Sequence, residues 1–217
     1  MKNLLKSSIK AFLLVCLLSF AGQSFGAKPV PGARIPELDD LDFTEMLMSV
    51  DVGKYSDVIQ KEQQAKGKKL TDKFNDKNGS AVETFRNKEV LLVTIPAKLL
   101  FDPNETLLNA KADDYLEPFK AYMKSPDEYR VLLVMHTDNT GSETYREEIA
   151  GERVESVFEW FEEQSGLDTS YVFTYNYADE MPLVENDTQQ NRDRNRRLEV
   201  YLMPGQKWID RLKKEKK

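Results

Sequence analysis

Between residues 79 and 203 the hydrophobic and polar positions of this chain follow regular patterns, whereas the preceding segment is less ordered. Five short runs are apolar or alternate between apolar and polar positions, and they are rich in β-branched and aromatic residues. Such runs predict strands. They are residues 81–85, 90–95, 130–135, 171–177 and 198–203. We expect the first two to pair with each other.

Two longer segments, 107–124 and 142–164, have apolar residues at the three- and four-residue spacing of helices. Ser142 is a suitable N-cap for the second helix, and Gly166 is placed to end it. The polar segment 186–194 begins in the manner of a capped helix. Strands and helices that alternate in this order predict an α+β fold in which helices pack on a sheet.

Residues 1–26 have the pattern of a secretory signal peptide. Three lysines precede an apolar run at 11–20, and a polar stretch of small residues follows it. The alternative is a short membrane anchor, but the run is shorter than the roughly 20 residues that a span needs. Cys16, the only cysteine, follows Val15 rather than a small residue, which argues against lipidation. The processed chain would therefore have no thiol or disulfide.

Residues 27–78 are predicted to be a linker with short helices. Three prolines between 29 and 36 indicate an extended start. Residues 43–77 predict one or two surface helices with little core of their own, with a flexible tether as the alternative. The basic tail, 204–217, has Trp208, Ile209 and Leu212 on one side. It is expected to be a solvated helix or, alternatively, a segment that contacts an anionic surface.

Charge and composition exclude several functions. The chain has 31 Lys and Arg against 37 Asp and Glu, and removal of three lysines with residues 1–26 leaves 28 against 37, a charge of −9. This argues against a nucleic-acid binder, which needs a basic face. One histidine, His136, and no cysteine in the processed chain leave no zinc cluster and few nucleophile–base pairs. We therefore expect a protein that is not an enzyme and needs no cofactor or metal.

Four motifs give a more specific indication. The chain has Phe101-Asp102-Pro103-Asn104 before the first predicted helix, and Met135-His136-Thr137-Asp138 at a turn. Segment 146–154 opens the second helix, and Asn195-Arg196-Arg197-Leu198-Glu199 opens the last strand. These motifs, with Pro182 and Asn186, resemble the OmpA C-terminal-like domain family over residues 79–203. The family differs at three positions, having glycine at 135, asparagine at 146 and glycine at 191.

The resemblance implies a mixed sheet of β-α-β-α-β order and non-covalent binding of peptidoglycan in the periplasm, with or without association with the outer membrane. The implied ligand is diaminopimelate, whose free end carries an ammonium and a carboxylate. Asp138 would take the ammonium and Arg153 the carboxylate through a forked pair. Asn104 and Thr140 would donate or accept neutral hydrogen bonds at the rim. Arg146 and Arg197 complete the implied site, although Arg196 and Arg197 are equally suited to bracing the fold.

The residues alone do not bring this site together. Asp138 and Arg153 are separated by about four turn residues and roughly 16 Å of helix rise, so their convergence rests on the resemblance. Arg146 in place of asparagine leaves an alternative open, a periplasmic adaptor of the same fold that binds a protein partner rather than the wall. The sequence does not indicate the role of residues 28–78, the oligomeric state or any envelope partner.

Overall fold

The computed structural model describes residue 38 and residues 40–74 and 79–215. The predicted signal peptide and the proline-rich start of the linker lie outside these residues. Within them, every helix is too short or too polar to cross a lipid bilayer.

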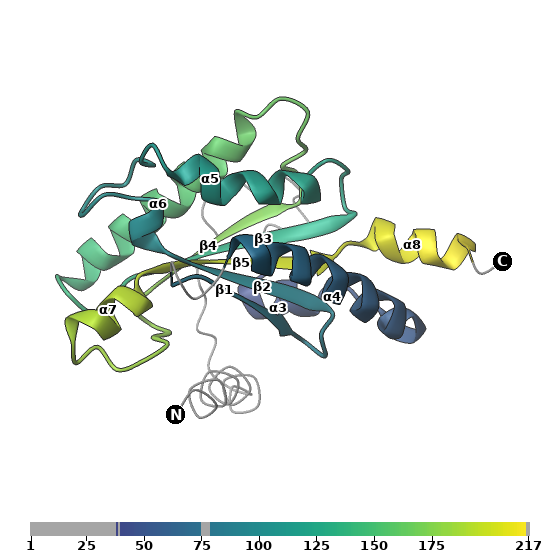
Figure 1. The fold of residues 1–217 in the computed structure, drawn as a ribbon, viewed down its shortest axis with the longest axis horizontal. Helices are drawn as coiled ribbons and strands as arrows, with labels where there is room; N and C mark the ends of the chain where they lie inside the picture. The colour runs from purple at the N-terminus through teal and green to yellow at the C-terminus, as the bar shows by residue number, and fades with distance from the viewer. Residues whose placement is uncertain (1–37, 39, 75–78, 216–217) are drawn as a thin grey trace.

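A five-stranded mixed sheet forms the centre of the fold, with strand order β1-β2-β5-β3-β4 (Figure 1). β3 and β4 run parallel, whereas the other neighbouring strands are antiparallel. All five predicted strands and the α+β class with a mixed sheet are confirmed. The strands are β1 (Ala81–Phe85), β2 (Val90–Pro96), β3 (Tyr129–His136), β4 (Val172–Ala178) and β5 (Arg197–Pro204).

Both long helices lie on the same face of the sheet. α4 (Ser56–Lys73) approaches β2 closely, since a Cβ at Gly67 would come within 2.9 Å of the Leu91 side chain. α6 (Glu143–Glu162) contacts β4, where the Asn176 amide donates to the Glu147 carbonyl at 2.7 Å. The strand register places Leu91 and Asn176 on one face.

The opposite face is covered by α3 (Phe43–Met48). The Phe43 ring lies 5.5, 5.7 and 5.0 Å from the rings of Tyr175, Tyr177 and Tyr201. The sequence predicts little core for segment 43–77, but many apolar residues of its described part, 43–74, are buried. These are Phe43, Met46, Leu47, Val50, Val52, Tyr55, Ile59, Leu70 and Phe74. The prediction failed because β3 and β5 are buried along their whole length, so both faces of the sheet need an apolar cover.

The helix predicted at 107–124 is shorter and irregular. Leu108 pairs with Phe101 in an isolated β-bridge, and α5 spans only Ala112–Leu116. A 3₁₀ helix, η3 (Glu117–Tyr122), continues it with a proline in its first turn. Pro118 lacks the N–H that an α-helical hydrogen bond needs. The remaining short helices are η1 (Gly53–Tyr55), η2 (Ala97–Leu99) and α7 (Gln189–Asn195).

Helix caps agree in part with the sequence. Ser142 caps α6 as predicted, and its hydroxyl accepts from the Tyr145 N–H at 3.2 Å. α6 stops at Glu162, so Gly166, with φ of +80°, lies in the loop beyond the helix end. The cap of α7 is Thr188 rather than Asn186. Side chains that accept from these first-turn N–H groups fix where each helix begins.

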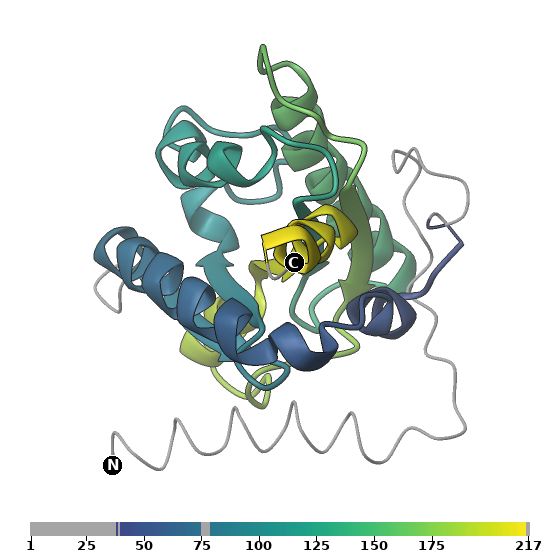
Figure 2. The same cartoon turned by 90° about the vertical axis from the view of Figure 1, so that its right-hand side faces the viewer.

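The basic tail forms α8 (Gln206–Glu215), which lies at the end of the sheet opposite α7 (Figures 1 and 2). Trp208, Ile209 and Leu212 are buried. The Trp208 ring packs 5.1 Å from that of Tyr129, and the Lys66 ammonium lies 4.5 and 4.6 Å from the Tyr129 and Trp208 rings. The tail is helical as expected, but its apolar side joins the domain core rather than solvent. Contact of its basic side with an anionic surface stays a prediction.

Gly205 allows the close approach between α8 and the loop before β3. A Cβ at this position would lie 2.0 Å from the backbone carbonyl oxygen of Asp127. The Gly205 N–H donates to the Glu128 carbonyl at 3.0 Å, and the Lys207 N–H donates to the Asp127 carbonyl at 3.0 Å. Because the obstructing atom belongs to the backbone, no rotamer change makes room for a side chain.

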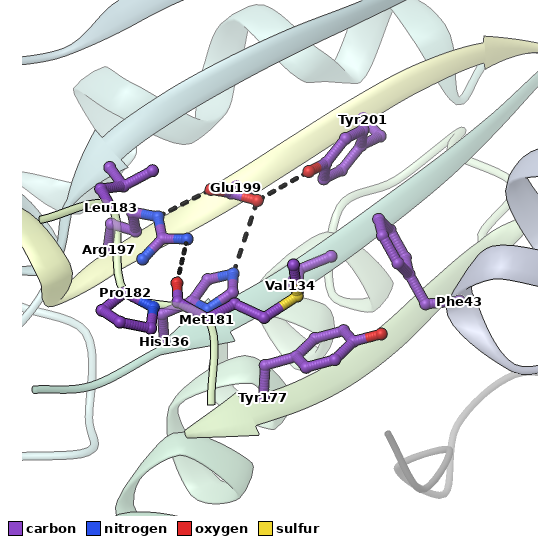
Figure 3. Close-up of a pocket in the computed structure, with 10 residues that line it drawn as sticks. All are labelled: Phe43, Val134, His136, Tyr177, Met181, Pro182, Leu183, Arg197, Glu199 and Tyr201. Carbon is purple, nitrogen blue, oxygen red and sulfur yellow. Dashed lines mark hydrogen bonds and ion pairs between the residues drawn. The ribbon is translucent and has the colours of Figure 1, made fainter. Parts of the chain in front are cut away.

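A small cavity with a mainly apolar lining and a buried charged network lies near Phe43 of α3 on the second face of the sheet (Figure 3). Arg197 donates to Glu199 at 2.7 Å, Tyr201 donates to the other Glu199 oxygen at 2.7 Å, and His136 Nε2 lies 3.4 Å from that same oxygen. His136 also stacks on Tyr177 with ring centroids 5.8 Å apart. The cavity measures about 30 Å³, which is too small for a wall fragment.

Burial dominates the ionisation of His136 in this network. It lowers the pKa of His136 to about 4, Arg197 acts in the same direction, and Glu199 opposes both. For Glu199, burial raises the pKa, but the charges of Arg197 and His136 outweigh it and hold the pKa well below its usual value. At neutral pH, Arg197 and Glu199 therefore form a buried ion pair beside a neutral histidine.

Gly205→Ala should lower the free energy of unfolding by about 1–3 kcal/mol, because the added methyl group meets backbone. Gly151→Ala is the matched control, since its Cβ would meet only the Asn176 amide at 3.4 Å. In the helix interior this change should be neutral or stabilising by up to about 1 kcal/mol. Urea unfolding of both variants measures the difference, and equal stability would contradict the packing argument.

The stability of the domain should fall as the pH falls from 7 to 5. An unfolded chain protonates His136 near the usual histidine pKa of 6.5, whereas the folded chain resists protonation until about pH 4. Stability from this group is therefore complete above pH 6.5 and decreases below it. Wild type should lose about 2 kcal/mol more than His136→Gln between pH 7 and pH 5. If the free energy of unfolding changes equally with pH in the two proteins, His136 is not the group responsible.

Candidate functional site

The candidate site lies where β3 ends and β5 begins. His136 pairs with Arg197 in the register of these antiparallel strands. Asp138, two residues beyond His136, and Arg196, just before Arg197, therefore lie close together at the same edge of the sheet. Their carboxylate and guanidinium form an ion pair.

Asp138 is almost fully buried, with 2% of its surface exposed. Its Oδ1 accepts from the Thr140 N–H at 2.7 Å and from the Thr140 hydroxyl, and its Oδ2 accepts from Arg196. Burial raises the pKa of the carboxyl, but the Thr140 hydrogen bonds and the Arg196 charge outweigh burial and lower it. Asp138 is therefore an ionised and rigidly held carboxylate.

Arg153 points from α6 towards the loop that follows β2. Its Nε donates to the Glu105 carbonyl at 2.9 Å, and its Nη2 lies 3.5 Å from the Asp102 carbonyl. The guanidinium lies 4.9 Å from the centre of the Phe101 ring. Arg153 thus fixes the loop that carries the Phe101–Asn104 motif.

The charge of Arg153 is unbalanced. Only 5% of the residue is exposed, and no carboxylate of the described residues lies within ion-pair distance of it. Burial lowers the pKa of the guanidinium, and the nearby charge of Arg196 adds to this effect, against an opposing contribution from Tyr145. Backbone carbonyls are weak counter-charges, so this group is suited to bind an external anion.

Arg196 joins the two residues that the sequence singled out. It pairs with Asp138 and with Asp193, and its charge acts on Arg153. From sequence, Arg196 is equally suited to bracing the fold and to touching ligand, and it is not among the predicted site residues. The position of Arg196 at the start of the last predicted strand is the signal that could have identified it. Consecutive strand residues point to opposite faces, so Arg196 and Arg197 are expected to have different surroundings.

The three side chains of the Asn195-Arg196-Arg197 motif lie in three different environments. Asn195 is buried and exchanges hydrogen bonds with the backbone of Val184 at 3.1 and 2.8 Å. Arg196 lies at the site. Arg197 belongs to the buried network around Glu199, where its remaining donors bond the carbonyls of Asn195 and Met181 at 3.1 and 3.0 Å. The structure therefore separates Arg197 from the other predicted site residues.

The predicted rim residues have different positions. Thr140 is exposed, but its donors hold Asp138 in place. Asn104 has a left-handed backbone, with φ of +61°, and its Oδ1 accepts from the Tyr145 hydroxyl at 3.2 Å. This bond connects the loop held by Arg153 with the first turn of α6. Tyr145 has the helical spacing of the buried Ile149, yet 41% of it is exposed.

Arg146 connects the turn after Asp138 with the loop after β4. Its Nε donates to Asp179 at 2.7 Å, and its Nη1 donates to the Gly141 carbonyl at 2.7 Å. The positive charge that replaces the family asparagine is thus neutralised by Asp179. In this arrangement Arg146 braces the turn that carries Asp138.

The arrangement gathers charges of both signs at one edge of the sheet. The guanidinium groups of Arg153 and Arg196 lie there with the carboxylates of Asp138 and Asp193. The N-terminus of α6 begins beside them, where free N–H groups favour anions. No three His, Cys, Asp or Glu residues of the described chain are grouped to hold a metal ion. The groups present are complementary to a ligand that carries a carboxylate next to an ammonium.

Known proteins match this chain in sequence and fold. The OmpA family model matches residues 100–196. The probable lipoprotein YiaD of Escherichia coli K12 is 28% identical over 153 residues, 70% of this chain and 65% of that protein. The outer-membrane lipoprotein YfiB of Pseudomonas aeruginosa is 30% identical over 106 residues, 49% of this chain and 62% of that protein. The chain thus spans less than two thirds of the length of these relatives.

Solved structures share the fold. A putative MotB-like protein from Desulfovibrio vulgaris superposes with a TM-score of 0.59 at 22% identity, covering 70% of this chain and 96% of that one. The cell wall anchor of the T6SS from Pseudomonas aeruginosa gives 0.53 at 20% identity, covering 64% and 96%. The resemblance seen in the sequence is confirmed over residues 100–196, which match the OmpA family model.

Proposed function

We propose that this protein binds peptidoglycan without a covalent bond, through the diaminopimelate residue of the stem peptide, and so links the cell envelope to the wall. The observation that carries the proposal is the buried Arg153 guanidinium, which has no carboxylate partner among the described residues. The names of the related wall anchor and envelope lipoproteins support the same conclusion. We place the protein in the periplasm.

Each end group of the ligand has a counterpart. The ligand carboxylate accepts a forked pair of hydrogen bonds from Arg153, with Arg196 as a second cation nearby. The ligand ammonium approaches Asp138, whose outer oxygen is shared with Arg196. Asp193 can retain Arg196 when the ammonium takes its place beside Asp138. Asn104, Thr140 and Arg146 hold the surrounding turns in position.

The expected affinity for one isolated ligand is modest. A hydrogen bond to a charged group contributes about 1.5–3 kcal/mol net, and binding also has ordering costs. Two such contacts correspond to a dissociation constant of roughly micromolar to millimolar. Retention on a polymeric wall would rest on rebinding to many identical sites.

Arg153→Met should reduce co-sedimentation with peptidoglycan sacculi about tenfold or more, because the neutral side chain keeps the aliphatic stem but loses the forked donor. Asp138→Asn should have a similar effect. Arg211→Met is a matched control, since it removes an exposed cation of α8 at the opposite end of the sheet. Thermal melting confirms that each variant is folded.

Unchanged co-sedimentation of both site variants would overturn wall binding through this site. It would favour the alternative, an adaptor that kept the fold and binds a protein partner.

Sacculi whose stem peptides carry lysine in place of diaminopimelate should bind at least about tenfold more weakly. The lysine side chain ends in an ammonium without a carboxylate, so Asp138 keeps its partner and Arg153 does not. Co-sedimentation with the two kinds of sacculi under the same salt conditions measures this difference. Equal binding would mean that Arg153 does not recognise the ligand carboxylate.

A further inference from the structure

The two charges of the candidate site belong to different elements of the fold. Asp138 lies in the turn that follows β3, whereas Arg153 lies on α6. A ligand that carries an ammonium and a carboxylate on one carbon atom fits only a narrow range of separations between these two groups. The contacts that hold α6 against the sheet near the end of β3 therefore set the geometry of the site.

A β-bulge near the end of β4 supports the turn that follows β3. Met135 pairs with Asn176, but His136 pairs with Ala178, so β4 has one extra residue at this point. Ala178 has a left-handed backbone, with φ of +41°, which is unfavourable for a residue that has a Cβ. Its carbonyl accepts from the Thr137 N–H at 2.7 Å. The first residue of the turn is thus fixed by the bulge, and bulges beside functional sites commonly aim a side chain.

The Asn176 side chain joins this bulge to α6. Its Oδ1 accepts from the Ala178 N–H at 3.0 Å, a local bond that supports the left-handed residue. Its Nδ2 donates to the Glu147 carbonyl of α6 at 2.7 Å. Gly151, one turn further along α6, leaves room for the amide, since a Cβ there would lie 3.4 Å from Nδ2. One end of the amide therefore bonds the bulge, and the other end bonds the helix.

We propose that Asn176 is a positioning residue for peptidoglycan binding, which fixes the separation of Asp138 and Arg153 without touching the ligand. This inference rests on the proposed function and adds to it a residue outside the motifs that indicate the site. Thr137, held by the bulge, is the neighbour of Asp138. Glu147 lies less than two turns before Arg153 on the same helix. The amide thus connects both charged groups through one short path.

A fixed separation increases affinity because the binding groups need not be ordered when the ligand arrives. Without the amide link, α6 can shift relative to the bulge. The contacts to the ligand carboxylate and to its ammonium are then no longer optimal at the same time. The Arg146–Asp179 ion pair still holds the turn, so loss of Asn176 should loosen the site rather than unfold the domain.

Co-sedimentation of the full processed chain with peptidoglycan sacculi tests this role, with thermal melting of each variant measured alongside. Asn176→Ala should weaken binding about five- to tenfold at a temperature where the protein is folded. Gln63→Ala is the matched control, because Gln63 also joins two elements through an amide that donates to the carbonyls of Glu89 and Leu202. It should lower the melting temperature at least as much, since Gln63 is fully buried, and keep binding within about twofold.

Asn176→Asp separates the two hydrogen bonds of the amide. A carboxylate still accepts from the Ala178 N–H but cannot donate to the Glu147 carbonyl, so this variant should lose about as much affinity as Asn176→Ala. It also tests the role of the helix bond if Asn176→Ala fails to fold.

The positioning role is refuted if folded Asn176→Ala binds sacculi within about twofold of wild type, or if Gln63→Ala loses as much affinity as Asn176→Ala. Wild-type affinity in Asn176→Asp would equally refute it, because the bond to α6 would then not matter. Failure of wild type itself to bind sacculi would instead refute the proposed function.

Discussion

The site depends on a buried guanidinium whose hydrogen bonds go to backbone carbonyls and not to a carboxylate. Arg153 holds the loop after β2 through the carbonyls of Asp102 and Glu105 and packs beside Phe101. Burying a charge without a counter-ion has a free-energy cost, and favourable interactions elsewhere in the domain must offset it. A bound carboxylate would supply the missing charge, which is why the proposed ligand contact is assigned to this guanidinium.

At this edge of the sheet, the consecutive residues Arg196 and Arg197 have different surroundings. Arg196 pairs with Asp138 at the site, whereas Arg197 pairs with Glu199 beneath α3. Alternation along a strand sends neighbouring side chains to opposite faces. The buried network therefore fixes the start of β5, and with it the position of Arg196, without contributing an atom to the site.

Cover on both faces of the sheet explains the role of the described residues before 79. Phe43 packs against three tyrosines of β4 and β5, and the Arg86 guanidinium donates to the Leu47 carbonyl. α4 lies on the first face, where Gln63 donates to the carbonyls of Glu89 and Leu202 at 2.8 and 2.9 Å. The apolar side of α8 is buried in the same core. The segments on either side of the predicted domain thus contribute to a single core.

The sequence by itself determined the strands, the capped helix from Ser142, the α+β class and the motifs around Asp138 and Arg153, because each depends on local periodicity or on residue identity. Tertiary structure decided the rest. The spacing of apolar residues in 43–74 and in 208–212 indicates that each helix has an apolar side that must be buried. It does not indicate which part of the sheet that side packs against. The approach of Arg196 to Asp138, across 58 positions of the chain, depends on strand register. Arg153 similarly reaches a loop 48 positions away because α6 packs on β3 and β4.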